Sequence, residues 1–260
     1  MKVSLVQHDI VWEDAAATHR HVEPLVAAAA AAGARLVVLT EMFAVGFSMA
    51  ADRIAEPVEG SSHAFLLHQA ERHGTWLCAS VPTRDPALPR PVNRLYLVAP
   101  DGRTWHYDKL HPFTHAGEHE HYAAGADFLT VDVEGVRCSF FVCYDLRFAD
   151  EWWQRAGDTD CYVVPANWPE PRRHHWQALL SARAIENQAY VAGVNRVGEG
   201  GGLAYAGDSR VLDPMGEVLA SASRVETVLT AEVDPAVVRD TRQRFRFLQD
   251  RRTHAVRSPE

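Results

Sequence analysis

Lysine is almost absent from this chain of 260 residues: among its 26 basic side chains, only Lys2 and Lys109 are lysines. Acidic residues number 34, which leaves a formal net charge of −8. Binding to nucleic acid or to an anionic membrane requires a basic surface, because both partners are polyanions. The charge balance therefore argues against either of them as the main partner.

A long apolar run is also missing from the sequence. No stretch approaches the roughly 20 apolar residues that cross a membrane. The first residues, MKVSLVQHDIVWED, turn polar too early for a signal peptide. We therefore expect a cytoplasmic protein.

Only four cysteines occur, and no two of them form a C-x-x-C pair: Cys78, Cys138, Cys143 and Cys161. A zinc ribbon and a thioredoxin-type motif are thereby excluded. In the cytosol the four thiols are expected to be reduced. At least one of them is then available for chemistry.

The remaining composition is that of an ordinary globular protein, with 47% hydrophobic and 23% charged residues. The length permits one large domain or two small ones, but no repeat, low-complexity tract or linker divides the chain. We expect residues 1–260 to form a single domain with a C-terminal tail from about residue 240, where arginines gather.

Short apolar runs alternate with helical patterns along the chain. Helices are expected at 19–32, from Ser61 or Ser62 to about 72, at 149–156, at 173–188 and from Pro235, and strands at 3–6, 36–39, 76–81, 94–98, 104–107, 128–133, 136–142, 162–164, 190–194, 209–212, 218–220 and 228–233. The dipeptides Asp101-Gly102 and Glu134-Gly135 predict two hairpins. Hairpins mixed with helical crossovers predict a layered α/β fold with mixed sheets. The many strands favour two packed sheets with helices outside.

Cys143 is the most informative residue. It follows the apolar run Ser139-Phe140-Phe141-Val142 and precedes a polar cluster that leads into a predicted helix. α/β folds place functional groups at such strand ends, where backbone N–H groups lower the pKa of a thiol and hold an oxyanion. The alternative is a structural cysteine, since free cysteines are usually buried.

Glu41 lies just beyond the predicted strand 36–39 and is followed by the apolar residues Met42 and Phe43. Partial desolvation raises the pKa of a carboxyl group toward that of a general base. The alternative is a solvated loop glutamate.

Lys109 follows the predicted strand 104–107 in a chain that otherwise uses arginine. An ammonium is a compact point charge, unlike a guanidinium, and a fixed ammonium stabilises a developing oxyanion. The alternative is a surface lysine paired with Asp108.

The stretches around these three residues, LTEMFAVGFSM, YDKLHPF and FFVCYDLRF, resemble the Glu, Lys and Cys motifs of the nitrilase superfamily of carbon–nitrogen hydrolases, in that family's order. The likeness extends from KVSLVQHDI to GDSRVLDPMGEVL, and EMFAVGFSM and CYDLRFADEWW are most similar to the omega-amidase branch. The resemblance implies a four-layer αββα sandwich of two mixed sheets with helices outside. It also implies a homodimer formed through the helical face, to which Trp152 and Trp153 either contribute or belong as core.

Residue by residue, the resemblance implies that Glu41 is the general base, Lys109 an oxyanion donor and Cys143 the nucleophile. Glu118, in HAGEHEHYAAG, matches a further glutamate of the family that orients the lysine or a water molecule. The backbone N–H of Tyr144 is expected to be a second oxyanion donor. The chemistry passes through a thioester and requires neither a metal nor an organic cofactor.

The implied reaction is hydrolysis of the terminal amide of a small acid, such as the α-keto acid ω-amides α-ketoglutaramate and α-ketosuccinamate, to the acid and ammonia. A small anionic substrate depends on a charged anchor for its binding. Nearby arginines are candidates for this anchor, and aromatic residues for the pocket wall: Arg147, Arg172 and Arg173, and Phe43, Tyr144 and Trp168.

Histidine clusters and a glycine run suggest other chemistry, but weakly. The clusters His115, His119 and His121, and His174 and His175, arise by chance in a chain with 14 histidines. The run 198–202 lacks the G-x-G-x-x-G pattern before a helix. We therefore predict no metal site, and a flexible loop at the glycine run.

Other functions remain open at this point. Another amidase of the same superfamily would act on N-carbamoyl amino acids or on a modified glutathione, and a true nitrilase fits less well. A non-catalytic binding subunit would keep the fold, although the intact Glu41, Lys109 and Cys143 argue against it. A Rossmann oxidoreductase is disfavoured by the missing dinucleotide fingerprint.

Overall fold

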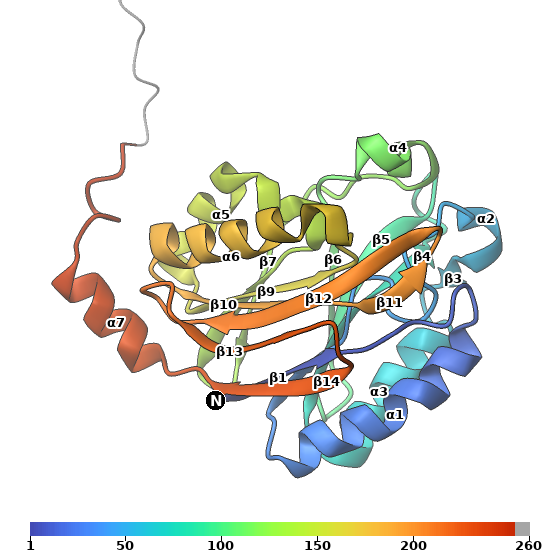
Figure 1. Ribbon diagram of the computed structural model, residues 1–260, viewed down its shortest axis with the longest axis horizontal. Coiled ribbons are helices and arrows are strands. Elements are labelled where there is room, and N and C mark those ends of the chain that lie inside the picture. The colour runs from blue at the N-terminus through green and yellow to red at the C-terminus, as the bar shows by residue number, and fades with distance from the viewer. Residues whose placement is uncertain (253–260) are drawn as a thin grey trace, which may run out of the picture.

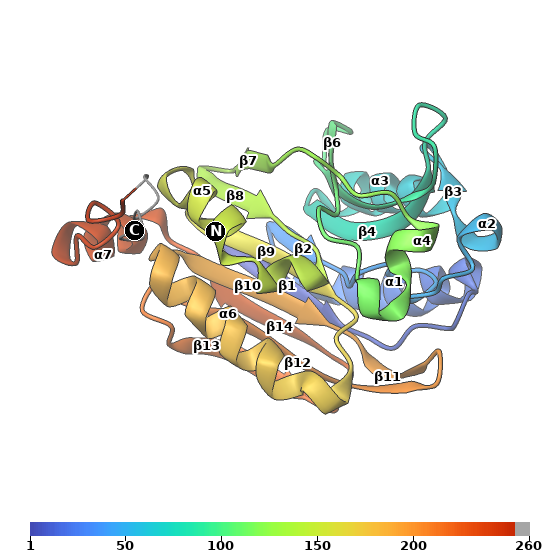
Figure 2. The same cartoon turned by 90° about the horizontal axis from the view of Figure 1, so that it is seen from above.

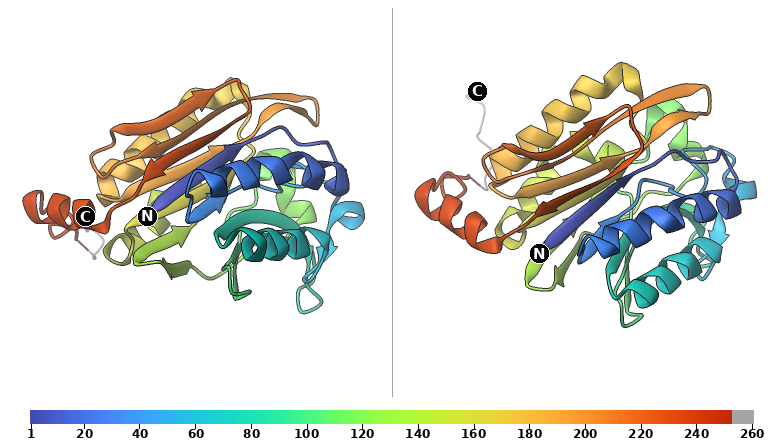
Figure 3. Two further views of the ribbon diagram at one scale, coloured as in Figure 1. Left: turned by 90° about the horizontal axis from the view of Figure 1, so that it is seen from below. Right: turned by 60° about the horizontal axis from the view of Figure 1, so that its bottom comes forward.

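Two mixed sheets of seven strands each lie face to face, and helices cover their outer faces (Figure 1). A computed structural model of the chain describes residues 1–252. Helices α1 (Ala15–Ala31) and α3 (Ser61–His73) cover the first sheet, while α5 (Ala149–Arg155) and α6 (Arg173–Asn187) cover the second (Figures 2 and 3). The predicted four-layer αββα sandwich is therefore confirmed.

The first sheet has the spatial order β14-β1-β2-β4-β5-β6, with β3 beside β4. Its strands are β1 (Lys2–Gln7), β2 (Leu36–Val38), β3 (Glu56–Pro57), β4 (Trp76–Arg84), β5 (Val92–Val98), β6 (Thr104–Asp108) and β14 (Thr227–Glu232). Crossovers through α1, and through α2 (Ala51–Ile54) and α3, make β1, β2 and β4 parallel. The predicted hairpin at Asp101-Gly102 joins the antiparallel strands β5 and β6.

The second sheet has the spatial order β11-β12-β10-β9-β8-β7, with β13 beside β12. Its strands are β7 (Leu129–Val133), β8 (Val136–Phe140), β9 (Cys161–Ala166), β10 (Tyr190–Asn195), β11 (Val197–Gly200), β12 (Leu203–Leu212) and β13 (Val218–Ser223). Crossovers through α5 and α6 make β8, β9 and β10 parallel. The predicted hairpin at Glu134-Gly135 joins β7 to β8.

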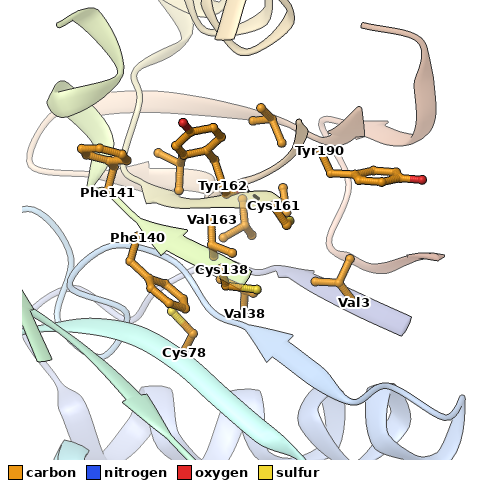
Figure 4. Close-up of a cluster of buried hydrophobic side chains, with 14 of the residues drawn as sticks. Val3, Val38, Cys78, Cys138, Phe140, Phe141, Cys161, Tyr162, Val163 and Tyr190 are labelled. Carbon is orange, nitrogen blue, oxygen red and sulfur yellow. Dashed lines mark hydrogen bonds between the residues drawn. The ribbon is translucent and has the colours of Figure 1, made fainter. Parts of the chain in front are cut away.

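The main hydrophobic core fills the space between the two sheets. Figure 4 shows Val38 and Cys78 from the first sheet facing Cys138 and Phe140 from the second. Cys161 is buried in the same cluster. The thiols of Cys78, Cys138 and Cys161 are thus completely buried core groups.

Several predicted elements have different bounds in the structure, and the predicted flexible loop is part of a hairpin. Helix α1 begins at Ala15 rather than at residue 19, because the side chain of Asp14 accepts a hydrogen bond from the Ala17 N–H at 2.9 Å and caps the helix there. The glycine run 198–202 forms most of β11 and the turn into β12 rather than a flexible loop, because residues 198–200 pair with β12.

Helix α6 buries the face that packs on the second sheet. Its buried residues include Trp176, Leu180 and Ala184. The neighbouring Ile185 is 48% exposed. It lies one position beyond the buried row, about 100° further around the helix.

The chain leaves the sandwich after β14 through α7 (Pro235–Arg244), which projects to one side in Figure 1. The tail expected from about residue 240 starts within α7, and residues 253–260 lie outside the described part. Within residues 1–252, no helix combines the length and apolarity required to cross a membrane.

Candidate active site

Three segments bring the predicted functional side chains together where strands end. Glu41 lies three residues after β2, Lys109 directly follows β6, and Cys143 begins the short 3-10 helix η2 (Cys143–Arg147) shortly after β8. β2 and β6 belong to the first sheet and β8 to the second. The site is therefore built between the two sheets, and the sandwich fixes its geometry.

Lys109 lies between two buried glutamates. Its Nζ donates to Glu41 Oε1 at 2.9 Å and to Glu118 Oε2 at 2.8 Å. Glu118 begins the short helix α4 (Glu118–His121), in the loop that follows the lysine. All three side chains are almost completely excluded from solvent. The structure thus brings the three predicted charged groups into direct contact.

Two asparagines that the sequence analysis missed complete this charge cluster. Asn93 Nδ2 donates to Glu41 Oε1 at 2.8 Å and to Glu118 Oε1 at 3.2 Å, opposite the lysine. The backbone N–H of Asn167 donates to the other oxygen of Glu41 at 2.8 Å. A polar residue inside the apolar strand VNRLYLV was the available signal for Asn93.

The electrostatics of the cluster follow from burial and from its close contacts. Burial alone would lower the pKa of Lys109, but the negative charges of Glu118 and Glu41 outweigh it and raise that pKa above the usual value. Burial is also the largest influence on Glu118, whose pKa is raised even though Lys109 opposes the shift. Lys109 therefore stays an ammonium throughout the working pH range.

Cys143 faces a cavity beside this cluster. Burial, and then the negative charge of Glu41, raise the pKa of its thiol well above the usual range, whereas Lys109 acts in the opposite direction. The pKa of this thiol is thus raised, whereas the position at a strand end predicted that backbone N–H groups lower it. The thiol is protonated at rest, and Glu41 is the neighbouring group that can take its proton.

The cavity has a volume of about 450 Å³ and reaches from the charge cluster to the surface. Aromatic side chains form much of its wall: Trp12, Phe47, Phe113, Tyr144, Trp168 and Tyr205. Tyr144 is the second residue of η2, so the helix offers no acceptor to its backbone N–H. That N–H is available beside the thiol.

Arg147 and Arg172 both line the cavity, as predicted for a substrate anchor. The Arg147 guanidinium lies 4.8 Å from the ring centre of Trp168, and that of Arg172 lies 5.4 Å from the ring centre of Phe113. Within the described residues, neither forms an ion pair with a carboxylate. Two guanidinium groups are thus free to bind an anion in the cavity.

Two residues predicted for the substrate pocket lie elsewhere. Phe43 is buried in the core under α1 and α3, where it packs near His19 and Phe65, and Phe47 lines the cavity in its place. Arg173 starts α6 and forms a two-point ion pair with Asp208 at 2.7 and 2.8 Å. Its charge is already neutralised outside the cavity.

The clustered histidines do not come together with other metal-binding side chains of the described residues. Within residues 1–252, no group of three His, Cys, Asp or Glu side chains could hold a metal ion. Among the clustered histidines, His115 lines the cavity, and His174 and His175 meet edge to face with ring centres 4.3 Å apart.

Sequence comparisons place this geometry among known enzymes. The carbon-nitrogen hydrolase family matches residues 2–243. Omega-amidase YafV of Escherichia coli K12 is 41% identical over 252 residues, which cover 96% of each chain. A 2-oxoglutaramate amidase of Bacillus subtilis is 35% identical over 207 residues, covering 77% of this chain and 78% of the relative.

Solved structures of similar fold cover almost the whole chain. A CN-hydrolase superfamily protein from Xanthomonas campestris, solved with an arsenic adduct in its active site, superposes with a TM-score of 0.93 at 38% identity and 98% coverage of both chains. A nitrilase superfamily member from Saccharomyces cerevisiae gives a TM-score of 0.85 at 27% identity and 94% coverage of both.

Proposed function

The chain belongs to the carbon–nitrogen hydrolase family, and from this premise we propose that it is an omega-amidase, which hydrolyses the terminal amide of a small α-keto acid. The observation that carries the proposal is the contact of Lys109 with Glu41 and Glu118 beside Cys143, next to a cavity lined by two guanidinium groups that pair with no carboxylate of residues 1–252. The names of the relatives, omega-amidase and 2-oxoglutaramate amidase, support the same substrate class.

Acylation starts from the protonated thiol. Glu41 removes the proton of Cys143, and the sulfur attacks the amide carbon. The carbonyl oxygen becomes an oxyanion, which the Lys109 ammonium and the Tyr144 N–H stabilise. Glu41 then returns its proton to the amide nitrogen, the C–N bond breaks, and ammonia leaves a thioester on Cys143.

Deacylation repeats these steps with water as the nucleophile. Glu41 takes a proton from water as the oxygen attacks the thioester carbon, and the same donors hold the second oxyanion. The C–S bond then breaks, and the proton held by Glu41 returns to the sulfur. Glu118 remains hydrogen-bonded to Lys109 and keeps its Nζ aimed at the oxyanion.

Substrate binding uses the positively charged side chains that line the cavity. The α-keto acid carboxylate is anchored by Arg147 or Arg172, because no other acid occupies them in the described chain. Hydrogen bonds between charged partners are stronger than neutral ones. The aromatic wall, including Trp168, encloses the carbon chain between the anchor and the amide.

The test is an ammonia-release assay with 2-oxoglutaramate, 2-oxosuccinamate, N-carbamoyl amino acids and simple nitriles. Release from the two keto acid amides, lost in Cys143→Ala and retained in the control Cys78→Ala, is the expected result. Preferred release from an N-carbamoyl amino acid would instead favour the neighbouring amidase activity. No release from any compound would leave the non-catalytic binding subunit.

We also propose that the chain is a cytoplasmic homodimer paired through its α5–α6 layer. Trp152 is completely buried in the core, but Trp153 on α5 is 37% exposed and Ile185 on α6 also reaches the surface. Exposed tryptophan is enriched at interfaces. Light scattering that reports only the monomer mass at micromolar concentration would contradict the dimer.

The proposed cytoplasmic location is supported by the cysteines. Four cysteines without a disulfide are typical of a reducing compartment.

A further inference from the structure

Asp145 is a buried carboxylate beside the nucleophile that the proposed mechanism does not use. Its side chain is 1% exposed. Oδ2 accepts from Tyr107 Oη at 2.7 Å and from the Val142 N–H at 2.9 Å. Oδ1 accepts from the N–H of His111 at 2.9 Å and from its Nδ1 at 3.0 Å. Four donors occupy the carboxylate, so it has no role left as a ligand for substrate.

One pair of contacts holds the backbone around Cys143. The Val142 N–H donates to the Asp145 side chain, and the Asp145 N–H returns to the Val142 carbonyl at 3.0 Å. The turn closed in this way contains Cys143, whose φ of 45° lies in the left-handed region. Residues other than glycine adopt this region only where the surroundings impose it.

The other contacts hold the backbone around Lys109. Tyr107 lies two residues before the lysine and His111 two residues after it, and both donate to Asp145. Burial, followed by the charge of Asp145, raises the pKa of Tyr107 well above its usual range, so the phenol remains a donor. The His111 ring is further fixed by stacking on Phe148 with ring centres 3.7 Å apart.

We infer that Asp145 is a positioning residue that holds the nucleophile and the oxyanion donor, Cys143 and Lys109, at a fixed separation. A single carboxylate ties the segments on both sides of these two residues, although they belong to different sheets. The inference rests on the proposed function, because attack at carbon and stabilisation of oxygen must occur together. A displacement of about 1 Å in such a pair costs about 10²-fold in rate.

The first variant is Asp145→Asn, in which an NH2 group replaces one acceptor and leaves two donors without a partner. We expect kcat to fall about 10²-fold with little change in KM, because the anchors in the cavity remain. Asp160→Asn is the matched control. Asp160 is equally buried and accepts from Arg137, but it lies at the other end of the second sheet, just before β9.

A milder pair of variants covers the possibility that Asp145→Asn does not fold. Tyr107→Phe removes one donor to Asp145, and Tyr162→Phe removes an equally buried hydroxyl that donates to the Trp152 carbonyl. The rate of Cys143 alkylation by iodoacetamide is measured against pH for both. This readout requires no substrate, so it tests the positioning even if no amide is hydrolysed.

We expect Tyr107→Phe to lower kcat, expressed per Cys143 thiol that iodoacetamide can label, and to shift the pH dependence of Cys143 alkylation. Tyr162→Phe and Asp160→Asn should keep the wild-type values of both. If Asp145 only stabilised the fold, the variants would contain less folded protein. The folded molecules would then keep the wild-type kcat per reactive Cys143 and the wild-type pH dependence of alkylation. Wild-type kcat per titratable Cys143, or an unmoved alkylation curve, in the folded variants would overturn the inference.

Discussion

A single ammonium group contacts two buried carboxylates in this site, and the resulting excess of negative charge determines whether the thiol of Cys143 is protonated. Lys109 contacts both Glu41 and Glu118, and the other hydrogen bonds to the two carboxylates come from neutral donors of Asn93, Asn167 and the Phe113 backbone. A thiolate at Cys143 would add a further negative charge to this buried cluster, where charges are poorly solvated. The resting enzyme therefore keeps the proton on sulfur and uses Glu41 only during attack.

The roles of Glu41 and Lys109 predict a large loss of turnover on substitution. Glu41→Gln removes the base, and Lys109→Ala removes one oxyanion donor, a change that costs about 10²–10³-fold in rate. Ammonia release is the measurement, with the circular dichroism spectrum as a check on folding. The exposed neighbour Glu120, substituted by Gln, is the control. Near-full activity in either active-site variant would show that its role is wrong.

The same two substitutions should move the reactivity of Cys143 in opposite directions. The charge of Glu41 raises the pKa of the thiol and that of Lys109 lowers it. Glu41→Gln should therefore shift the alkylation curve to lower pH, although turnover falls, and Lys109→Ala should shift it to higher pH. Peptide mapping after iodoacetamide treatment should find the label on Cys143, because the other three thiols are completely buried. Shifts of the same sign would contradict the charge assignment.

Secondary-structure elements explain which parts of the site the sequence could predict. Glu41, Lys109 and Cys143 were recognisable because each lies just beyond a strand, within a local motif. Asn93 reaches the site only through the pairing of β5 with β4 and β6 and through the loop that carries Glu118. Contacts of this kind depend on tertiary structure, which a single sequence does not display.

The two consecutive arginines, Arg172 and Arg173, show the same limit at a finer level. The 3-10 helix η4 (Glu170–Arg172) ends at the first and α6 begins at the second. One side chain therefore lines the cavity and the other pairs with Asp208. Neither composition nor motif distinguishes them, because the difference arises where two helical segments meet.

The packing of α6 on the second sheet predicts a local sensitivity to added volume. Gly193 in β10 lies under the helix, and a Cβ there would come within 2.7 Å of Leu180 and 3.0 Å of Trp176. Gly193→Ala should therefore lower the free energy of unfolding by about 1–3 kcal/mol. Urea denaturation measures the change. Gly157→Ala is the control, because nothing lies within 4 Å of its added Cβ, and an equal loss in the two variants would refute the packing argument.

At the scale of the whole molecule, the cavity and the surface carry opposite charge. The chain has a formal net charge of −8, yet the charged residues that line the cavity are Lys109, Arg147 and Arg172. An anion is thus repelled by the molecule as a whole and attracted by one site on it. Within residues 1–252, no carboxylate lines the cavity wall to pair with a positively charged substrate. This distribution favours keto acid amides over amino acid amides with a free ammonium group.

The charge of the cavity predicts that a distant carboxylate improves catalysis. The comparison is 2-oxoglutaramate against pentanamide, a neutral amide with the same number of carbon atoms. A hydrogen bond to a charged group contributes about 1.5–3 kcal/mol, so kcat/KM should favour the anion by about tenfold to a hundredfold. Arg147→Met and Arg172→Met identify the anchor, because the substitution that removes it should abolish most of the preference. Arg20→Met, on the exposed surface of α1, should leave the preference unchanged. Equal kcat/KM for the two amides in the wild-type protein would rule out an anion anchor, because the neutral amide lacks the carboxylate that such an anchor binds.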